Sequence, residues 1–359
     1  MLRDWLDCRN VVVRAPNALG DIIMATGAFA RLAAHFGKDR LSLICSPAAA
    51  SLLGGNTWFK EVIAYDRGGA HKGISGGRRF IKQLRERKFD LAVIFPNSFS
   101  SAWQMMRAGV RKRLGYFKEG RGLLLGAGRK RDEDADGHFV PKYTGQYFMD
   151  LLDVIGLPPG SLSPQLPVSD EERGNAAAFL ADNKLEGGPL VIIAPGAAFG
   201  PSKLWPAERF AEVARALREG GARVMLSYAP GEEDTVARVQ TGLKSPLVTS
   251  RGLNLGVLKA LVARASLVIS NDTGPRHLAV ALGRPVLCLM GPNDPRYSEL
   301  AGAAHDHVIV EKVDCSPYAQ PCQLKQCPID HRCMKGISVE RVLKEAKKTV
   351  AAPSVAQHE

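Results

Sequence analysis

Residues 267–277 read LVISNDTGPRH, and this stretch decides the fold of the chain. Its apolar start predicts a buried strand, and Pro275 suits the first position of a helix that Gly283 ends. A helix N-terminus offers unpaired backbone N–H groups and the positive end of the helix dipole, and Gly274 lets a ligand approach the backbone. The pattern is typical of a diphosphate-binding turn, although an ordinary strand-to-helix turn of an α/β protein carries the same signals.

A second loop of this kind follows the apolar residues 190–194 and precedes a helix that we expect to begin near Ala207. It reads PGAAFGPSKLWP over residues 195–206, so it is rich in glycine and carries one lysine, Lys203. An ammonium group at the carboxyl end of a strand can neutralise the charge that develops on a phosphate oxygen as its bond breaks. A solvated surface lysine is the alternative, but the shaped loop favours a ligand-binding role.

A third loop lies near the start of the chain, after the strand predicted for residues 11–14. It reads APNALG over residues 15–20, and Asp21 then begins a helix. Taken alone, Asp21 is explained as a helix N-cap, which stabilises a helix by about 1 kcal/mol. If the carboxyl ends of two parallel sheets face each other across a cleft, Asp21 instead points towards a ligand held by Lys203 and is placed to act as a general base.

Short apolar runs alternate with amphipathic helical stretches along the chain. Further strands are predicted at residues 41–45 and 91–95, and the alternation indicates α/β domains with parallel sheets. Residues 156–167 are rich in proline and are interpreted as a linker, after which Ser169 caps a new helix and the alternation restarts. We therefore expect two doubly wound, Rossmann-like domains that face each other across a cleft, with the three loops at that cleft.

The composition is that of a basic protein with enough apolar residues for two cores. The chain has 359 residues, of which 45% are hydrophobic, a formal net charge of +12 and a pI near 9.5. No segment approaches the roughly 18 consecutive apolar residues of a membrane span, and no signal peptide is recognisable, so we expect a cytosolic protein. The charge indicates an acidic partner, for which nucleic acid, an anionic membrane and a charged glycolipid compete.

Much of the positive charge lies in the first half of the chain. The basic residues there are Arg78, Arg79, Lys82, Arg85, Arg87, Lys88, Arg107, Arg111, Lys112, Arg113, Lys118, Arg121, Arg129, Lys130 and Arg131. Each one alone is best explained by a solvated helix face. Together they predict a basic rim that binds an acidic acceptor and draws the protein to an anionic leaflet. They are not interleaved with stacking aromatic residues, which argues against a nucleic-acid-binding protein.

The seven cysteines fall into two groups. The first three, Cys8, Cys45 and Cys288, sit in or near apolar runs and are interpreted as small buried residues. The other four cluster late in the chain, at Cys315, Cys322, Cys327 and Cys333. In a cytosolic protein such a cluster suggests a metal site or a redox-labile disulfide pair. Because the spacing lacks the C-x-x-C pairs typical of zinc sites, we predict no bound metal.

Five motifs, in this order, resemble glycosyltransferase family 9, the bacterial lipopolysaccharide heptosyltransferases, and within it the heptosyltransferase II type. The motifs are LGD at 19–21, FPNSFSSA at 95–102, the loop at 195–206, NDTGPRH at 271–277 and GPNDP at 291–295. The resemblance covers nearly the whole chain and implies a GT-B-like fold. It implies an N-terminal acceptor-binding domain at residues 1–168 and a C-terminal nucleotide-sugar donor-binding domain at 169–337. Residues 338–359 are then a helix and a tail, and the helix is expected to pack back on the N-terminal domain.

The resemblance also implies roles for particular residues. Asp21 matches the proposed catalytic base, and Lys203 matches the lysine that contacts the donor phosphates. Glu232 should reach the ribose, and Leu253 should lie near the adenine. The predicted donor-binding residues are Gly196, Ser202, Lys203, Glu232, Leu253, Asp272, Thr273, Gly274 and His277. The predicted acceptor-binding residues are Asn17, Gly20, Asn97, Ser98, Arg78 and Arg79.

Two of these roles have structural alternatives. His277 is also explained as a hydrogen-bonded helix residue packed on the sheet, and Asp272 either binds donor sugar hydroxyls or fixes the turn through its side chain. Arg276, and the pair Ala18-Leu19, stand where relatives commonly carry other residues. These departures leave the fine specificity open.

The reaction that the resemblance implies is an inverting, metal-independent transfer of heptose from ADP-heptose to an inner-core lipopolysaccharide acceptor. No cofactor is expected, because ADP-heptose is a substrate. The enzyme would work at the cytoplasmic face of the inner membrane as a peripheral protein without a transmembrane segment. The alternatives are a family 9 transferase for another nucleotide sugar, a sugar-nucleotide hydrolase or epimerase, and a basic nucleic-acid-binding protein.

Overall fold

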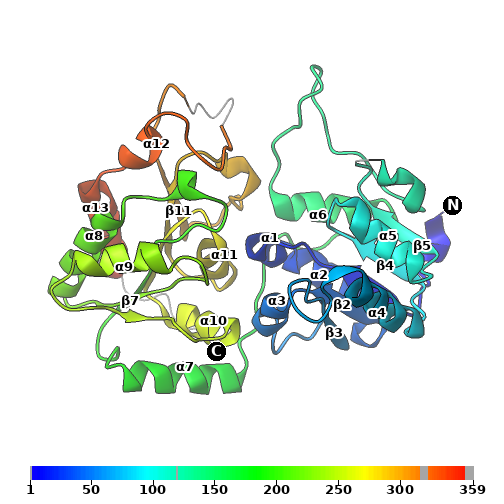
Figure 1. Cartoon of the computed structure of the whole chain (residues 1–359), viewed down its shortest axis with the longest axis horizontal. Coiled ribbons are helices and arrows are strands. Elements are labelled where there is room, and N and C mark those ends of the chain that lie inside the picture. The colour runs from blue at the N-terminus through cyan, green and yellow to red at the C-terminus, as the bar shows by residue number, and fades with distance from the viewer. Residues whose placement is uncertain (1, 119, 316–321, 352–359) are drawn as a thin grey trace. The chain divides into compact units, whose positions relative to one another are not determined.

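The structure is a computed structural model that describes residues 2–118, 120–315 and 322–351. The chain divides into two compact units, with the boundary between Pro167 and Val168. Each unit holds its own sheet of parallel strands, with helices packed against it (Figure 1). The predicted C-terminal tail, residues 352–359, lies outside the described residues.

The first unit is built on a five-stranded sheet. Its strands are β1 (Val11–Arg14), β2 (Leu41–Cys45), β3 (Glu61–Ala64), β4 (Leu91–Ile94) and β5 (Lys112–Gly115). Their order is β3-β2-β1-β4-β5, and every neighbouring pair is parallel. Because β1, β2 and β4 are buried along their whole length, their sequences are almost continuously apolar. The strand order reverses between β1 and β4, so the loops that follow these strands border the crevice where such sheets bind ligands.

Six α-helices lie among the described residues of the first unit. They are α1 (Leu19–Met24), α2 (Thr26–Phe36), α3 (Pro47–Leu52), α4 (Gly73–Glu86), α5 (Phe99–Arg107) and α6 (Thr144–Asp153). Gly37 ends α2 with a φ of +78°. Asp21 is the third residue of α1 and not its N-cap, because the helix begins at Leu19 and Ala18 occupies the capping position.

The second unit contains a six-stranded sheet. Its strands are β6 (Leu190–Ala194), β7 (Arg223–Leu226), β8 (Val248–Thr249), β9 (Leu267–Asn271), β10 (Val286–Met290) and β11 (Asp306–Val310). Their order is β11-β10-β9-β6-β7-β8, again with parallel pairs throughout. Here the strand order reverses between β6 and β9. The loops after these two strands are the two that the sequence marks as phosphate-binding.

The helices of the second unit include a predicted capping box. They are α7 (Asp170–Asp182), α8 (Ala207–Glu219), α9 (Glu233–Thr241), α10 (Leu255–Arg264), α11 (Gly274–Ala281), α12 (Arg332–Lys335) and α13 (Val339–Ala351). At the start of α7, the Ser169 hydroxyl accepts from the Glu172 N–H (3.2 Å), and the Glu172 carboxylate accepts from the Ser169 N–H (2.8 Å). The helix start at Ser169 is therefore confirmed.

The last helix, α13, belongs to the second unit. Its Val342 and Ala346 are fully buried in the same apolar cluster as Val191 and Ile269, and the helix contacts α8, β9 and β10. We expected this helix to pack back on the first domain. Its apolar face instead covers the sheet that directly precedes it in the chain, where its hydrophobic surface is removed from water. None of the described helices has the length and apolar content that a bilayer crossing requires.

Candidate functional site

Two loops meet where the strand order of the second unit reverses. The loop after β6 contains the 3₁₀ turn Pro201–Lys203, and Asp272 follows β9. The ammonium of Lys203 donates to the Asp272 carboxylate (Nζ to Oδ2, 2.9 Å) and to the Asp272 carbonyl (3.1 Å). Lys203 is only 8% exposed, so the alternative of a solvated surface lysine is wrong. The structure thus joins two of the predicted donor-binding residues.

Hydrogen-bond donors surround the carboxylate of Asp272. Besides Lys203, it accepts from Arg276 (Nη1 to Oδ1, 3.0 Å) and from Asn293 (Nδ2 to Oδ2, 2.7 Å). Burial alone would raise the pKa of Asp272, but the positive charges of Lys203 and Arg276 outweigh that effect and hold the pKa well below its ordinary value. The carboxylate is therefore ionised and fixes the turn, as in one of the two alternatives for this residue.

Arg276 sits in an ion-pair chain that sequence reasoning missed. Its guanidinium has no exposed surface and pairs with both oxygens of buried Asp306 (Nε to Oδ1, 3.0 Å; Nη2 to Oδ2, 2.8 Å). With Lys203 and Asp272, the buried group contains two cations and two carboxylates, so its formal charges cancel. An arginine within an apolar helix was the available signal, because a buried guanidinium requires an acidic partner.

Asn271 holds the two loops together from the end of β9. Its side-chain amide donates to the carbonyls of Pro195 (2.8 Å) and Gly196 (3.1 Å), and its Oδ1 accepts from the Trp205 N–H (3.3 Å). Asn271 is completely buried. It belongs to the quoted motif but not to the predicted donor-binding residues. Its role is to hold both ends of the loop that carries Lys203.

Ser202 is hydrogen-bonded to the cysteine-rich segment, here the described residues 322–333, which contain Cys322, Cys327 and Cys333. Its hydroxyl donates to the Leu324 carbonyl (2.5 Å), and its N–H donates to the Lys325 carbonyl (3.2 Å). Ser202 is 2% exposed, so its side chain is already engaged inside the protein. Gly200 packs on the same segment, because a Cβ there would lie 2.5 Å from the Lys325 carbonyl oxygen. Ser202 therefore affects the predicted donor site through the position of the loop.

Gly196 and Glu232, two predicted donor-binding residues, lie against each other. A Cβ at Gly196 would lie 2.0 to 2.3 Å from the Glu232 carboxyl group. Glu232 precedes α9, its Oε2 accepts from the Ala229 N–H (2.9 Å), and burial raises its pKa. Leu253 follows β8, which neighbours β7, so its loop opens at the same edge of the sheet.

Thr273, Gly274 and His277 form the start of α11. Thr273 takes the N-cap position without a side-chain capping hydrogen bond, and Gly274 is the first helical residue. His277 is 8% exposed, and burial together with the charge of Arg276 lowers its pKa to about 4. A neutral imidazole does not neutralise phosphate charge, and α11 packs on β9 and β10. These observations favour the alternative of a helix residue packed on the sheet.

In the first unit, Arg121 organises the loop after β4. It donates to the carbonyls of Pro96, Ser98 (3.3 Å) and Tyr116 (2.8 Å) and to the Asn97 side chain (3.3 Å). Arg121 has no exposed surface, so its assignment to a basic rim is wrong. Carbonyls from the loops after β4 and β5, together with the Asn97 side chain, accept from its guanidinium. The predicted acceptor residues Asn97 and Ser98 are therefore held in place by one buried guanidinium.

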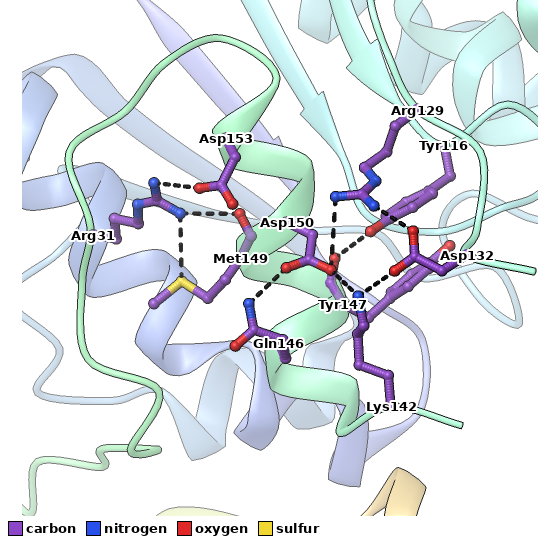
Figure 2. Close-up of polar contacts among 10 residues, drawn as sticks. All are labelled: Arg31, Tyr116, Arg129, Asp132, Lys142, Gln146, Tyr147, Met149, Asp150 and Asp153. Carbon is purple, nitrogen blue, oxygen red and sulfur yellow. Dashed lines mark hydrogen bonds and ion pairs between the residues drawn. The ribbon is translucent and has the colours of Figure 1, made fainter. Parts of the chain in front are cut away.

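Figure 2 shows how Tyr147 of α6 contacts Tyr116, which follows β5. Tyr116 and Tyr147 stack with their ring centroids 3.8 Å apart, and the Tyr116 hydroxyl donates to the Tyr147 carbonyl (2.6 Å). The Asn97 amide donates to the Tyr147 hydroxyl (2.9 Å). Tyr147 of α6 is thus connected to the loop after β5 by stacking and a hydrogen bond, and to Asn97 in the loop after β4 by hydrogen bonding.

Beside these tyrosines lies a compensated charge network. Lys142 and Arg129 each pair with both Asp132 and Asp150, and Gln146 donates to Asp150 (2.6 Å; Figure 2). The formal charges of these two cations and two carboxylates cancel. Arg129, which we assigned to the basic rim, is therefore neutralised within the protein and adds little to the attraction of an acidic ligand.

Known proteins are similar to this chain over both units. The family model described as glycosyltransferase family 9 (heptosyltransferase) matches residues 77–331. The chain belongs to glycosyltransferase family 9. Lipopolysaccharide heptosyltransferase 2 of Salmonella typhimurium is 30% identical over 298 residues, which are 80% of this chain and 84% of the relative. The Escherichia coli K12 protein of the same name is 28% identical over 297 residues, with the same coverage.

Solved structures resemble this family 9 chain along almost its whole length. The E. coli ADP-heptose lipopolysaccharide heptosyltransferase II has a TM-score of 0.77 and 25% identity, covering 95% of this chain and 98% of that one. The glycosyltransferase family 9 protein of Veillonella parvula has a TM-score of 0.81 and 22% identity, covering 96% of this chain and 98% of that one. The GT-B-like fold with two Rossmann-like domains is therefore confirmed.

The predicted acceptor residues of the family 9 chain separate into two places. Gly20 and Asp21 lie in the first turn of α1, and Asn17 lies in the loop before it. Asn17 and Ser98 line one small cavity. Arg78 and Arg79 lie on the exposed side of α4 and do not line that cavity, and Arg79 donates to the Ala70 carbonyl (3.0 Å).

The cysteines of the family 9 chain are all free thiols. Cys8, Cys45 and Cys288 are buried, as predicted, and so is Cys333. The Sγ atom of Cys327 accepts from the His331 N–H (3.3 Å). Within the part of the chain that the structure describes, only Asp134, Asp136 and His138 place three possible metal-ligand atoms within 4.8 Å of one another. The four late cysteines do not form such a group.

Proposed function

We propose that this protein transfers a heptose from ADP-heptose to an inner-core lipopolysaccharide acceptor, with inversion at the anomeric carbon. The observation that carries the proposal is the buried Lys203–Asp272 pair at the strand-order reversal of the second unit, in a chain of family 9. The choice of donor and acceptor is supported by the names of the similar Salmonella protein and the similar E. coli structure.

In this proposal the donor diphosphate binds between Lys203 and the start of α11. The first N–H groups of a helix have no partners within the helix, and Gly274 adds no side chain in front of them. Asp272 holds the Lys203 ammonium in a fixed position before the donor arrives. A preorganised charge of this kind stabilises a departing diphosphate by about 3 kcal/mol, because no reorganisation is needed during the reaction.

Asp21 serves as the general base. Its carboxylate takes the proton of an acceptor hydroxyl, and the hydroxyl oxygen forms a bond to the anomeric carbon. The bond from that carbon to the diphosphate oxygen breaks, and ADP leaves with the electron pair. A single displacement from the face opposite the diphosphate inverts the anomeric centre. Asp21 lies in the first turn of α1, where the helix dipole favours its negative charge.

The reaction as proposed requires no metal ion, because Lys203 and the α11 N-terminus supply the positive charge that a metal would otherwise provide. We also place the enzyme peripherally at the cytoplasmic membrane face, held by exposed basic residues such as Arg78 and Arg79. Sedimentation with anionic vesicles, weakened by salt and by Arg78→Gln/Arg79→Gln, is the expected result.

Nucleotide titration tests the donor site first. ADP, UDP and GDP are titrated calorimetrically, in EDTA, into the wild type, Lys203→Met and the control Lys244→Met, whose lysine is exposed. We expect selective ADP binding that Lys203→Met weakens at least tenfold and Lys244→Met leaves unchanged. A preference for UDP or GDP would assign another donor sugar nucleotide, and no binding of any nucleotide would refute the donor site.

Product analysis then separates transfer from its alternatives. ADP-heptose is incubated with and without the lipopolysaccharide precursor. We expect sugar transfer only with the acceptor, and Asp21→Asn should lower kcat by about 10²–10⁴ while leaving ADP affinity unchanged. Release of free heptose, or formation of an epimer, without acceptor would instead identify a hydrolase or an epimerase.

A further inference from the structure

A buried arginine closes β1 at the strand-order reversal of the first unit. Arg14 is the last residue of the strand and only 5% exposed. One of its terminal nitrogens donates to the Ile44 carbonyl (Nη1, 3.3 Å), and the guanidinium lies over the Tyr65 ring (5.1 Å to the centroid). Its Nε is buried and has no hydrogen-bond partner in the described ranges 2–118, 120–315 and 322–351. Buried donors are normally satisfied, so this atom requires an explanation.

The charge of Arg14 has no acidic partner among the residues that the structure describes. Within the described part of the chain, no carboxylate forms an ion pair with Arg14 or with the exposed Arg67. Burial, and to a smaller extent the nearby charge of Arg67, lower the pKa of Arg14 to about 10, so it remains charged at pH 7. The adjacent acid, Asp66, accepts from the N–H groups of Gly68 (3.2 Å) and Gly69 (2.9 Å) and is used by its own turn.

Such an arrangement is expensive for the folded protein. A buried charge without a counter-ion strongly destabilises the folded state, and two like charges near each other add to that cost. The ion-pair chain of Arg276 shows one solution, in which each buried cation has a carboxylate, and buried Arg121 shows another, in which carbonyls accept from the guanidinium. The different environment of Arg14 indicates that its counter-ion comes from a ligand.

The space for that ligand lies directly beside the guanidinium. A cavity of about 50 Å³ is lined by Arg14, Asn17, Tyr65, Arg67, Pro96, Ser98, Ser100, Ser101 and Gln104. This volume accommodates more than one water-sized group. The hydroxyls of Ser98 and Ser100 lie 3.2 Å apart. Among these lining residues are two cations and several hydroxyl or amide groups, and none carries a negative charge.

We propose that Arg14 and Arg67, with the hydroxyls of Ser98 and Ser100, form a subsite for an oxyanion of the sugar acceptor, either a carboxylate or a phosphate. The subsite lies where parallel α/β sheets bind ligands, between the loops that follow β1 and β4. It rests on the proposed transfer to an anionic lipopolysaccharide precursor and adds the group by which that precursor is recognised. The arginine fork supplies paired donors that match either oxyanion.

A binding measurement tests the subsite without any transfer reaction. The ¹⁵N–¹H signal of the Arg14 Nε–H, assigned by its loss in Arg14→Lys, is followed while sodium phosphate or sodium acetate is added at constant ionic strength. We expect a saturable shift of this signal with at least one of the two anions, and Arg67→Gln should raise the half-saturation concentration at least threefold. A signal that moves with neither anion, or moves without saturation and equally with sodium chloride, would refute the subsite.

Kinetics then identify the oxyanion on the acceptor. Arg14→Gln should raise the acceptor KM at least tenfold, with little change in donor KM, and Arg14→Lys should recover part of the loss. The control is Lys38→Gln, an exposed lysine between α2 and β2 that does not line the cavity. Urea unfolding of each variant monitors folding, and Arg67→Gln provides a second test at an exposed position.

Modified acceptors show whether the oxyanion bound at Arg14 is a phosphate or a carboxylate. If the penalty of Arg14→Gln disappears on acceptor treated with phosphatase, the ligand group is a phosphate. If it disappears on acceptor with methyl-esterified carboxylates, the group is a carboxylate. An equal penalty on the intact and both modified acceptors would overturn the proposal. Anion binding at Arg14 without heptose transfer would refute the proposed function alone, whereas transfer with an unchanged acceptor KM in Arg14→Gln would refute the subsite alone.

Discussion

The ammonium of Lys203 lies 2.9 Å from the carboxylate of Asp272, and the second oxygen of that carboxylate lies 3.0 Å from Arg276. One carboxylate therefore orients two buried cations that come from different segments of the second unit. This relationship explains how a lysine assigned to the donor phosphates stays buried before any ligand is bound. It also couples the stability of the unit to the preparation of the site.

Removing the shared carboxylate tests this coupling. Asp272→Asn leaves the buried Lys203 without its carboxylate partner, whereas Arg276 keeps Asp306, so the free energy of unfolding should fall by about 3–5 kcal/mol. In Lys203→Met, Asp272 keeps its hydrogen bonds from Arg276 and Asn293, so the free energy of unfolding should fall by less. Because the two residues interact, the double variant should cost at least 1 kcal/mol less than the sum of the single changes. Urea unfolding provides the comparison, and strictly additive costs would contradict the coupling.

Gly196→Ala is a change that should act on binding more than on stability. The new methyl group would occupy the position of the Glu232 carboxyl, which is the flexible end of a side chain and can move away. We expect the donor KM to rise at least fivefold and the free energy of unfolding to change by less than about 1 kcal/mol. Gly174→Ala, in the open part of α7, is the matched control and should leave the donor KM unchanged. If Gly196→Ala leaves the donor KM unaltered, Glu232 does not take part in donor binding.

His277 should make stability depend on pH in a defined window. Its pKa is about 4 in the folded protein, compared with roughly 6.5 in an unfolded chain. Between these values the unfolded state binds a proton that the folded state does not, so the free energy of unfolding falls as the pH falls. The loss should approach about 3 kcal/mol near pH 4. His277→Gln lacks this contribution.

The measurement is therefore the difference in unfolding free energy between wild type and His277→Gln at pH 7, 6, 5 and 4. That difference should be constant above pH 6.5 and decrease steadily below it. Asp272, with its lowered pKa, contributes mainly below the ordinary aspartate value of about 3.9 and so falls outside the window. A constant difference down to pH 4 would show that His277 titrates alike in both states.

Ser202→Ala should loosen the cysteine-rich segment. The variant loses the hydrogen bond to the Leu324 carbonyl, which is worth about 1 kcal/mol. If local opening controls thiol access, alkylation of Cys327 by iodoacetamide should become about fivefold faster, as peptide mass spectrometry would measure. Cys288, buried in β10, serves as the internal reference. An unchanged rate at Cys327 would mean that Ser202 does not hold this segment.

The sequence predicted those parts of the fold that local chemistry controls. The strands Val11–Arg14 and Leu190–Ala194 have the predicted bounds, because buried parallel strands require continuous apolar runs. The Ser169 capping box is equally local. By contrast, Arg276 and Asp306 are 30 residues apart in sequence, and no periodic pattern links them.

The candidate site was predictable at the level of its loops but not of its contacts. Lys203 and Asp272 were both predicted to bind the donor. Their ion pair was not predicted, because it depends on neighbouring strands that are far apart in sequence. Arg14 was not selected, because an arginine without an acidic partner is recognisable only when its surroundings are known. Arg121 was placed on the surface, because sequence cannot show that carbonyls from two separate loops accept from its guanidinium.

The position of α13 inside the second core has a genetic consequence. The indole N–H of Trp205 donates to the Ile337 carbonyl just before this helix (3.0 Å), so the helix also supports the loop that carries Lys203. A nonsense codon after Gly336 removes two buried anchors, Val342 and Ala346, together with that support. In a saturation screen of stop codons, the gene should therefore remain intolerant of truncation almost to codon 351, far beyond the last residue of any predicted binding motif.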